Sequence, residues 1–439
     1  MHRFLKLIAG AATLCASSMV MASDARSIAL GNAVIANGYG VHGAQANPAS
    51  LMAMQRRGEI THVRIGFSAE YRDTGDAVDI VTDSENDNLI NDIEQEIDNI
   101  SNQPITCNPF LDDGSTACLT GTQRLSDLSG QLLEIIDVVD GESFEALGAV
   151  DLGIAFTRSN VPLAVNLRIS AVGEVIPDIS DGDRAYVLEF EQALDNNNLT
   201  LDDISNASSL AVDLANGILN VDQPEDVLQS EATGGALVRT QLGLSLATSL
   251  AIGGNAVDIG ITPKLSLLRA RSLDINANDE FLDNVPSIVE RFEDSEEEET
   301  SFTADIGGSM QLPGVPLRVA TVIRNLIPES IETTDGFEFE TTPQLIIGAA
   351  FHRKMVSVTG DIALNEATLD GFSTQKMGIG VELGSRLLKL RGGIGHDAAR
   401  SEDSTALTLG FGLGAFEIGG RLSDIESLEF GAQLAFSFR

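Results

Sequence analysis

The stretch Leu428-Glu429-Phe430-Gly431-Ala432-Gln433-Leu434-Ala435-Phe436-Ser437-Phe438 alternates between two kinds of side chain. Successive side chains of a strand point to opposite faces, so Phe430 and Leu434 share one face, while Glu429 and Gln433 share the other. Aliphatic and aromatic side chains suit lipid, whereas charged and small ones suit a polar interior. Alternation over ~10 residues is typical of a strand in a transmembrane β-barrel.

The same alternation recurs along the chain. In the first example, Ile65 and Phe67 oppose Arg64 and Ser68. Beyond residue 22 no apolar stretch approaches the ~18 residues of a transmembrane helix, so this chain can cross a membrane only as a closed barrel. The runs number fourteen and start near residues 63, 150, 163, 238, 257, 302, 317, 345, 356, 377, 388, 407, 416 and 428.

The connections between the runs alternate between long and short. Long inserts cover 72–148, 172–236 and 269–301, and short turns such as 158–160 and 253–255 lie between them. Outer-membrane barrels have long extracellular loops and short periplasmic turns. We therefore predict an all-β transmembrane barrel of about 14 antiparallel strands over residues 59–439. A soluble β-sandwich is the alternative, but it gives no reason for strict alternation of loop length.

The long inserts carry apolar residues at helical spacing. Helices are predicted around Ile90–Ile100, Leu125–Val139, Tyr186–Leu194 and Ala207–Leu219, and these helical inserts are expected to be extracellular. The acidic run Glu293–Glu299 is predicted to be a solvated loop tip. Diffuse binding of divalent cations that bridge to lipopolysaccharide is the alternative interpretation of this run.

Residues 1–22 have the features of a signal peptide. The charged segment Met1–Lys6 precedes a short apolar run, which ends in Val20-Met21-Ala22. This pattern predicts export and cleavage, with the protein in the outer membrane of a Gram-negative bacterium. A lipoprotein anchored at Cys15 is the alternative, but Leu14 occupies a position where a small residue is normal.

The composition excludes one class of function. The chain has 27 basic and 65 acidic residues, with a formal net charge of −38. Such a charge repels nucleic acid and anionic lipid headgroups, so no nucleic acid partner is expected. The expected partners are outer-membrane lipid and lipopolysaccharide, and envelope proteins that contact the acidic loops.

The sequence contains no recognisable catalytic or cofactor motif. There is no HExxH, GxSxG or Walker A pattern, and no calcium loop. The stretch Gly38–Gly43 matches GxGxxG, but it leads into Asn47-Pro48, where a dinucleotide-binding helix would end early. We expect no catalytic residues, no metal, no cofactor and no enzyme.

Two short segments near the amino terminus resemble a known family. Ala25-Arg26-Ser27-Ile28-Ala29-Leu30-Gly31-Asn32-Ala33 and Ala44-Gln45-Ala46-Asn47-Pro48-Ala49-Ser50-Leu51 resemble the TraF-like conjugal transfer outer-membrane proteins, within the FadL-like barrels. The resemblance implies that residues 23–58 form a plug inside the barrel, with Gly31, Asn47, Pro48 and Ala49 in it. An ordinary surface loop is the alternative. Unlike FadL-like proteins, this chain has Arg439 after its last aromatic residue.

The resemblance also implies two possible functions. One is an envelope protein that is accessory to conjugal transfer or envelope assembly. The alternative is a FadL-like channel for uptake of a hydrophobic small molecule.

Cys107 and Cys118 are the two cysteines that remain after removal of residues 1–22. They bracket a turn-rich loop, and in an oxidising compartment such a pair most simply forms a disulfide. Metal binding is the weaker alternative, because the sequence has no CxxC motif and no nearby histidine. The absence of CxxC also excludes thioredoxin chemistry.

We predict that Cys107 and Cys118 are joined in the exported protein, where the closed loop would contribute about 3 kcal/mol to stability by chain entropy. Mass spectrometry after alkylation without reductant should find both thiols protected. Alkylation of both in protein purified from outer membranes would contradict this prediction.

Overall fold

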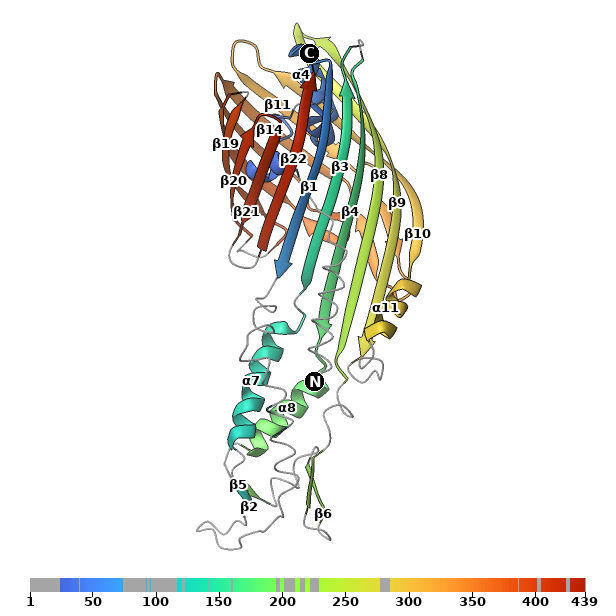
Figure 1. The fold of residues 1–439 in the computed structure, drawn as a ribbon, viewed down its shortest axis with the longest axis vertical. Helices are drawn as coiled ribbons and strands as arrows, with labels where there is room; N and C mark the ends of the chain where they lie inside the picture. Colours follow the sequence, from blue (N-terminus) through green and yellow to red (C-terminus); the bar gives the residue numbers. More distant parts are fainter. Residues whose placement is uncertain are drawn as a thin grey trace.

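The computed structural model describes residues 24–38, 40–73, 92, 95, 117–120, 123–141, 143–158, 161–194, 198–200, 210–213, 218–221, 229–276, 285–385, 387–400, 404–423 and 427–438. Within these residues, fourteen strands form one closed antiparallel barrel (Figure 1). The predicted signal peptide, Cys107 and nearly all of the stripe Ile90–Ile100 lie outside the described residues.

Each of the fourteen barrel strands lies on one of the alternating runs, so the predicted fold class is confirmed. The barrel closes between the first and last strands, where Ile65 pairs with Leu434. The strands are β1 (Thr61–Asp73), β3 (Phe144–Phe156), β4 (Leu163–Asp178), β8 (Glu231–Ile252), β9 (Asn255–Asn276), β10 (Glu297–Gln311), β11 (Leu317–Arg324), β14 (Gln344–Arg353), β15 (Val356–Ala363), β18 (Lys376–Gly384), β19 (Leu388–Asp397), β20 (Ala406–Leu413), β21 (Phe416–Leu422) and β22 (Ser427–Phe438).

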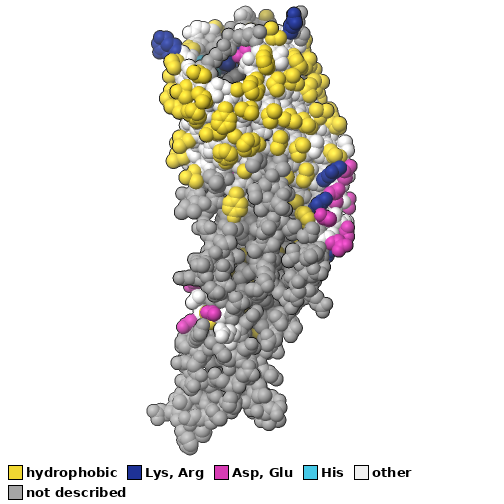
Figure 2. Space-filling view, viewed as in Figure 1, with side chains coloured by type: hydrophobic (Ala, Val, Ile, Leu, Met, Phe, Trp, Pro, Cys, Tyr) yellow, Lys and Arg dark blue, Asp and Glu magenta, His cyan; other side chains and the backbone are white. Residues whose placement is uncertain are grey.

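The two faces of the strands separate as the alternation predicts. Ile65 and Phe430 are exposed on the outside, at 51% and 42%, while Arg64 and Glu429 are each 1% exposed inside. On the face that Figure 2 shows, the outward apolar residues form a belt. The apolar face therefore meets lipid, and the charged face lines the lumen.

One side of the barrel wall is much taller than the other. β8 and β9 each have 22 residues, about twice the ~9–11 needed to span a membrane. These strands continue past the apolar belt, so the barrel wall runs into all three of the stretches 72–148, 172–236 and 269–301. Outside the belt, Arg269 and Glu298 pair across β9 and β10 at 2.8 Å.

The loop tip predicted at Glu293–Glu299 is partly wrong. The helix α11 (Val285–Asp294) ends within it, and Glu297 begins β10. Opposite charges on neighbouring strands stabilise each other, which allows acidic residues to continue a strand beyond the belt at the insert end. The ion pair between Arg271 and Glu296 supports the same arrangement.

The inserts contain a helical pair and short hairpins. The helices α7 (Gln123–Val139) and α8 (Asp181–Leu194) pack together below the barrel in Figure 1. They include the two ranges predicted as helical, Leu125–Val139 and Tyr186–Leu194. None of the helices in the described part of the chain is both long and apolar enough to cross a membrane.

The helix predicted over Ala207–Leu219 is wrong. The described residues there form β6 (Leu210–Asp213) and β7 (Ile218–Val221), which pair as a hairpin. The intervening sequence contains Asn216-Gly217, a dipeptide that favours a tight turn over a helix.

A second small sheet pairs β2 (Ala117–Thr120) with β5 (Asn198–Thr200).

Two further hairpins fold into the barrel against the inner face of its tall side. They are β12 (Glu329–Glu332) with β13 (Glu338–Thr341), and β16 (Ala367–Leu369) with β17 (Phe372–Thr374). Their buried Ile331, Phe339 and Phe372 pack with Leu237 and Leu268 of the wall. This apolar cluster covers part of the lumen at its insert end.

The structure places the inserts and the carboxyl terminus at opposite ends of the barrel (Figure 1). We predict that the insert end faces outward in the cell. An epitope tag introduced after Asp203 should therefore be labelled by antibody on intact cells. A tag at the Gly253-Gly254 turn should be labelled only after permeabilisation, and the reverse pattern would contradict this topology.

Candidate functional site: the plugged lumen

Residues 24–57 fold inside the barrel as a plug. Its elements are α2 (Ala25–Ala29), α3 (Gly40–Ala46), the 3-10 helix η1 (Pro48–Ser50) and α4 (Leu51–Arg56). Asp24 begins α2 by accepting hydrogen bonds from the backbone N–H groups of Arg26 and Ser27, both at 3.0 Å.

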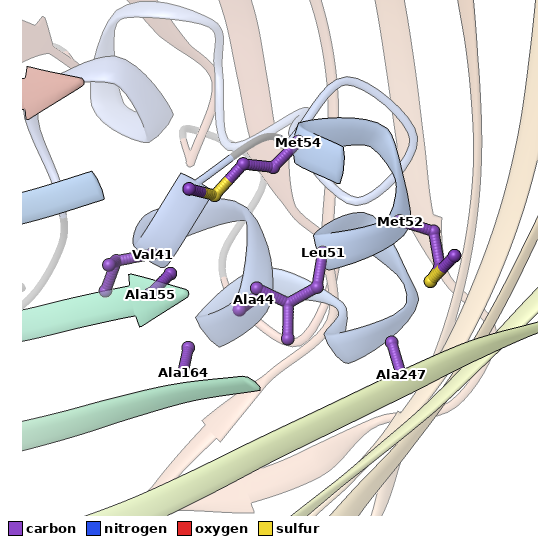
Figure 3. Close-up of a cluster of buried hydrophobic side chains, with 8 residues drawn as sticks. All are labelled: Val41, Ala44, Leu51, Met52, Met54, Ala155, Ala164 and Ala247. Atoms are coloured by element: carbon purple, nitrogen blue, oxygen red, sulfur yellow. The ribbon is translucent and has the colours of Figure 1, made fainter. Parts of the chain in front are cut away.

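Nearly the whole plug is buried. Figure 3 shows Leu51 and Met52 of the plug beside the barrel residues Ala155, Ala164 and Ala247. The small wall residues leave room for the larger plug residues. The plug therefore packs as part of the core and not as a loose tail.

Asn47 joins the plug to the barrel wall through hydrogen bonds. Its Oδ1 accepts from the Ala49 N–H at 3.0 Å, which shapes the start of η1, with Pro48 as the first residue. Its Nδ2 donates to the carbonyls of Gly308 and Thr321, both at 3.2 Å. One fully buried side chain thus sets a turn in the plug and anchors it to two adjacent strands.

Gly31 lies at a turn that only glycine fits well. Its φ is +63°, and a Cβ here would lie 2.5 Å from the carbonyl oxygen of Ile394. The structure thus places Gly31, Asn47, Pro48 and Ala49 in contact with the barrel wall or with one another, inside the lumen.

The wall meets the plug with glycines on its inner face. At each of these positions, an added Cβ would come within 3.0 Å of a plug atom. A Cβ at Gly260, for example, would lie 2.6 Å from the carbonyl carbon of Pro48. We call these wall glycines the glycine seats of the plug. They are Gly153, Gly260, Gly307, Gly348, Gly378, Gly380, Gly393, Gly410, Gly419 and Gly431.

Sequence reasoning missed the role of these glycines. It recognised small residues on the polar face of several strands, as at Gly431, but it interpreted them only as suitable for a polar lumen. Their recurrence at lumen-facing positions around the barrel was the available signal for a tightly packed plug.

Charged side chains fasten the plug at several points around the wall. Arg26, which is fully buried, donates from Nε to Glu382 at 3.2 Å and from Nη1 to the Asn37 carbonyl at 3.1 Å. Arg391 bridges Glu382 at 2.7 Å and Glu417 at 2.9 Å. Removing one partner of such a buried network typically costs about 3–5 kcal/mol, because a charge is left uncompensated.

Two plug residues have pKa values shifted by these surroundings. Burial, together with the Arg26 and Arg64 cations, lowers the pKa of His42 well below its usual value, so the imidazole is neutral at physiological pH. The hydrogen bond from Arg56 to Asp258, at 2.8 Å from Nη1, raises the pKa of that guanidinium.

Asp361 holds the middle of the plug. Its carboxylate accepts hydrogen bonds from the backbone N–H groups of Val34 and Ile35, the latter at 2.8 Å. On the opposite side, Arg64 donates to Gln45 at 2.6 Å. The plug is therefore fixed to strands on different sides of the barrel.

A cavity of about 260 Å³ remains in the lumen between the plug and the inner hairpins. It is rich in charge, and several of its charged groups form ion pairs. Lys264 and Asp305 pair between adjacent wall strands, and Arg239 of the wall pairs with Asp370 of the inner hairpin, both at 2.7 Å. The charged residues that line it are Asp24, Arg64, Asp151, Arg168, Arg239, Lys264, Asp305, Arg324, Asp361, Asp370 and Lys376.

Apolar side chains such as Val34, Ile346 and Leu369 also line the cavity, but an apolar ligand would have to remove water from the charges without replacing their hydrogen bonds. Across the residues that the structure describes, no cluster of three or more His, Cys, Asp or Glu side chains could hold a metal ion.

A closed barrel with an apolar belt, a charged lumen and an internal plug is an outer-membrane type of β-barrel. Residues 44–362 match the family model described as "F plasmid transfer operon, TraF, protein". The chain belongs to this family, which confirms the resemblance seen around Asn47-Pro48. No curated protein sequence matches the chain.

Solved structures of outer-membrane barrels are similar to this chain. The toluene transporter TodX of P. putida matches with a TM-score of 0.47 and 10% identity, over 96% of this chain and 99% of that chain. A Pseudomonas aeruginosa FadL homologue matches with a TM-score of 0.40 and 9% identity, over 96% and 100% of the two chains.

The adjacent glycines of β10 provide a test of the plug seat. A Cβ at Gly307 would meet Asn47 and lie 3.0 Å from Pro48 Cδ, whereas a Cβ at Gly308 would meet nothing closer than 3.8 Å. Gly307→Ala should therefore displace the plug, lower stability by about 1–3 kcal/mol and raise conductance in planar bilayers.

Gly308→Ala is the matched control, since it adds the same methyl group on the opposite face of the same strand. It should keep the wild-type conductance and change stability by about 0.5 kcal/mol or less. If both variants conduct like the wild type, the plug does not control leak.

Proposed function

We propose that this protein is a non-enzymatic envelope protein of the Gram-negative outer membrane, accessory to conjugal transfer or envelope assembly. It reaches the membrane through a signal peptide cleaved after residue 22. Membership of the TraF family and the plugged, charged lumen support this proposal.

The observation that carries the proposal is the filled, charged lumen. The plug touches the wall around the barrel, the hairpins β12–β13 and β16–β17 cover part of the insert end, and the remaining cavity is lined by charges. Sites for apolar small molecules are lined mainly by apolar side chains, with few polar groups. Charged and polar side chains make up much of the lining of this cavity, which favours a role for the outer surface.

The surface proposed for contact with a partner is the helical pair α7–α8. The pair lies at the insert end, below the barrel in Figure 1. Leu188 of α8 is 40% exposed and has Arg184 and Glu191 one helical turn away in the sequence. Acidic residues such as Asp181 begin the same helix. An envelope protein with a basic, partly apolar surface would complement it, while outer-membrane lipid and lipopolysaccharide contact the belt and its outer edge.

A channel for a hydrophobic small molecule is the competing function, and the presence of an internal cavity favours it. The two functions depend on different parts of the molecule. A channel needs the lumen, and an envelope accessory needs the surface of the inserts.

Two variants separate these functions in a deletion strain. Ser170 lines the cavity, so Ser170→Trp should fill it and block any transport through it. Leu188→Glu should leave the lumen unchanged and weaken contact at α8. We expect Leu188→Glu to lower conjugation frequency at least tenfold, while Ser170→Trp complements the deletion like the wild type.

Growth on long-chain fatty acids or alkanes is measured in the same strains. Loss of growth with Ser170→Trp, together with normal conjugation in the deletion strain, would establish the channel instead. Both variant proteins must show the heat-dependent gel shift of a folded barrel.

A further inference from the structure

The two ends of the barrel differ in their charged residues. Although the net charge is −38, Figure 2 shows Lys and Arg side chains at the rim above the apolar belt, while below the belt Asp and Glu side chains lie together with Lys and Arg. The net charge alone predicts repulsion from anionic lipid. The distribution of the charges gives a different expectation for the two ends.

The rim at the end with the short turns is basic. None of the turns 157–162, 253–254, 312–316, 354–355, 385–387 and 414–415 contains Asp or Glu. Arg57, Arg158, Arg353 and Lys354 are all exposed at this end. The segment that leads from α4 into β1 contains one acidic residue, Glu59, and it is buried at 6% exposure.

These positions lie at one level of the barrel. Ile60 donates its backbone N–H to the Phe438 carbonyl at 2.9 Å, and the Thr157 N–H donates to the Ile60 carbonyl at 3.0 Å. Arg57 and Arg158 are neighbours of these residues in the chain. Because adjacent strands are antiparallel, the Arg353-Lys354 turn lies at the same end.

Exposed apolar side chains accompany the basic ones. Val161, Val315, Met355 and Leu387 are exposed at 47%, 48%, 60% and 67% in four of the turns. Apolar side chains next to Lys and Arg are suited to the boundary between acyl chains and headgroups, because the long basic side chains can place their charges among the headgroups. A purely aqueous rim gives no reason for this combination.

The opposite edge of the belt has the reverse character. Beyond the belt at the insert end of β9 and β10, Arg269 and Arg271 pair with Glu298 and Glu296. Glu297 and Glu299 are exposed beside them. The basic residues there lie among acidic neighbours, whereas the short turns at the opposite end contain no Asp or Glu.

We propose that the short-turn rim, defined by Arg57, Arg158, Arg353 and Lys354, binds the headgroups of anionic phospholipids in the adjacent leaflet. The leaflet next to short periplasmic turns is the phospholipid leaflet of an outer membrane. The rim attracts phosphatidylglycerol-type headgroups through charge, and the apolar turn residues insert beside them. This contact fixes the depth of the barrel without use of the Trp girdle, since the sequence has no Trp.

Spin-label electron paramagnetic resonance tests the proposal on the full-length protein in phosphatidylcholine bilayers. Spin-labelled phosphatidylglycerol should be enriched around the barrel over spin-labelled phosphatidylcholine by about twofold or more at low salt. The enrichment should fall towards parity at high ionic strength, because salt screens exposed charges.

Two variants with the same change in net charge localise the effect. R57Q/R158Q/R353Q/K354Q should abolish the enrichment. R184Q/R269Q/R271Q/R291Q removes four basic residues from the insert end and should retain it. Both variants should show the heat-dependent gel shift of a folded barrel.

Three outcomes would overturn the proposal. The wild type could show no preference for the anionic lipid, the rim variant could keep the preference, or both variants could lose it equally. If the wild type shows no lipid preference but the rim variant lowers conjugation frequency in cells, the rim serves an acidic protein partner instead.

Discussion

The requirement that every backbone N–H and C=O within lipid has a hydrogen-bond partner governs this structure. Strands satisfy it only when the sheet has no free edge, so β1 must pair with β22 along its length. Closure creates an outside that meets lipid and an inside that does not. The alternation of Ile65 with Arg64 is the consequence at the level of single residues.

Closure also creates a lumen that must be either open or filled. Here the plug fills much of the lumen, and wall glycines such as Gly260 and Gly307 leave space for Pro48 and Asn47. Buried ion pairs such as Arg26 with Glu382 add directional contacts. Because the plug and the wall pack closely as a single core, a methyl group added at one of these wall glycines is expected to displace atoms of both.

Net charge proved a poor guide to the surface of this molecule. A value of −38 describes the sum, while a membrane leaflet experiences only the charges within about 10 Å of it. The basic rim and the acidic inserts stand at opposite ends of the barrel. Because only nearby charges act on a partner, the α7–α8 pair and the short turns are suited to different partners.

The sequence by itself determined the barrel, the strand count and the lipid-facing residues, because period-two alternation depends only on local strand geometry. It also located helices such as α7, because the spacing of apolar residues along a helix depends only on residues close together in the chain. Only the tertiary structure decided the extra height of β8 and β9, the hairpin at Leu210–Val221 and the ion pairs that place Glu296 and Glu298 beside strand β9. These features depend on contacts between residues far apart in the chain, as do the glycine seats, and no local pattern encodes which distant side chain will occupy a given space.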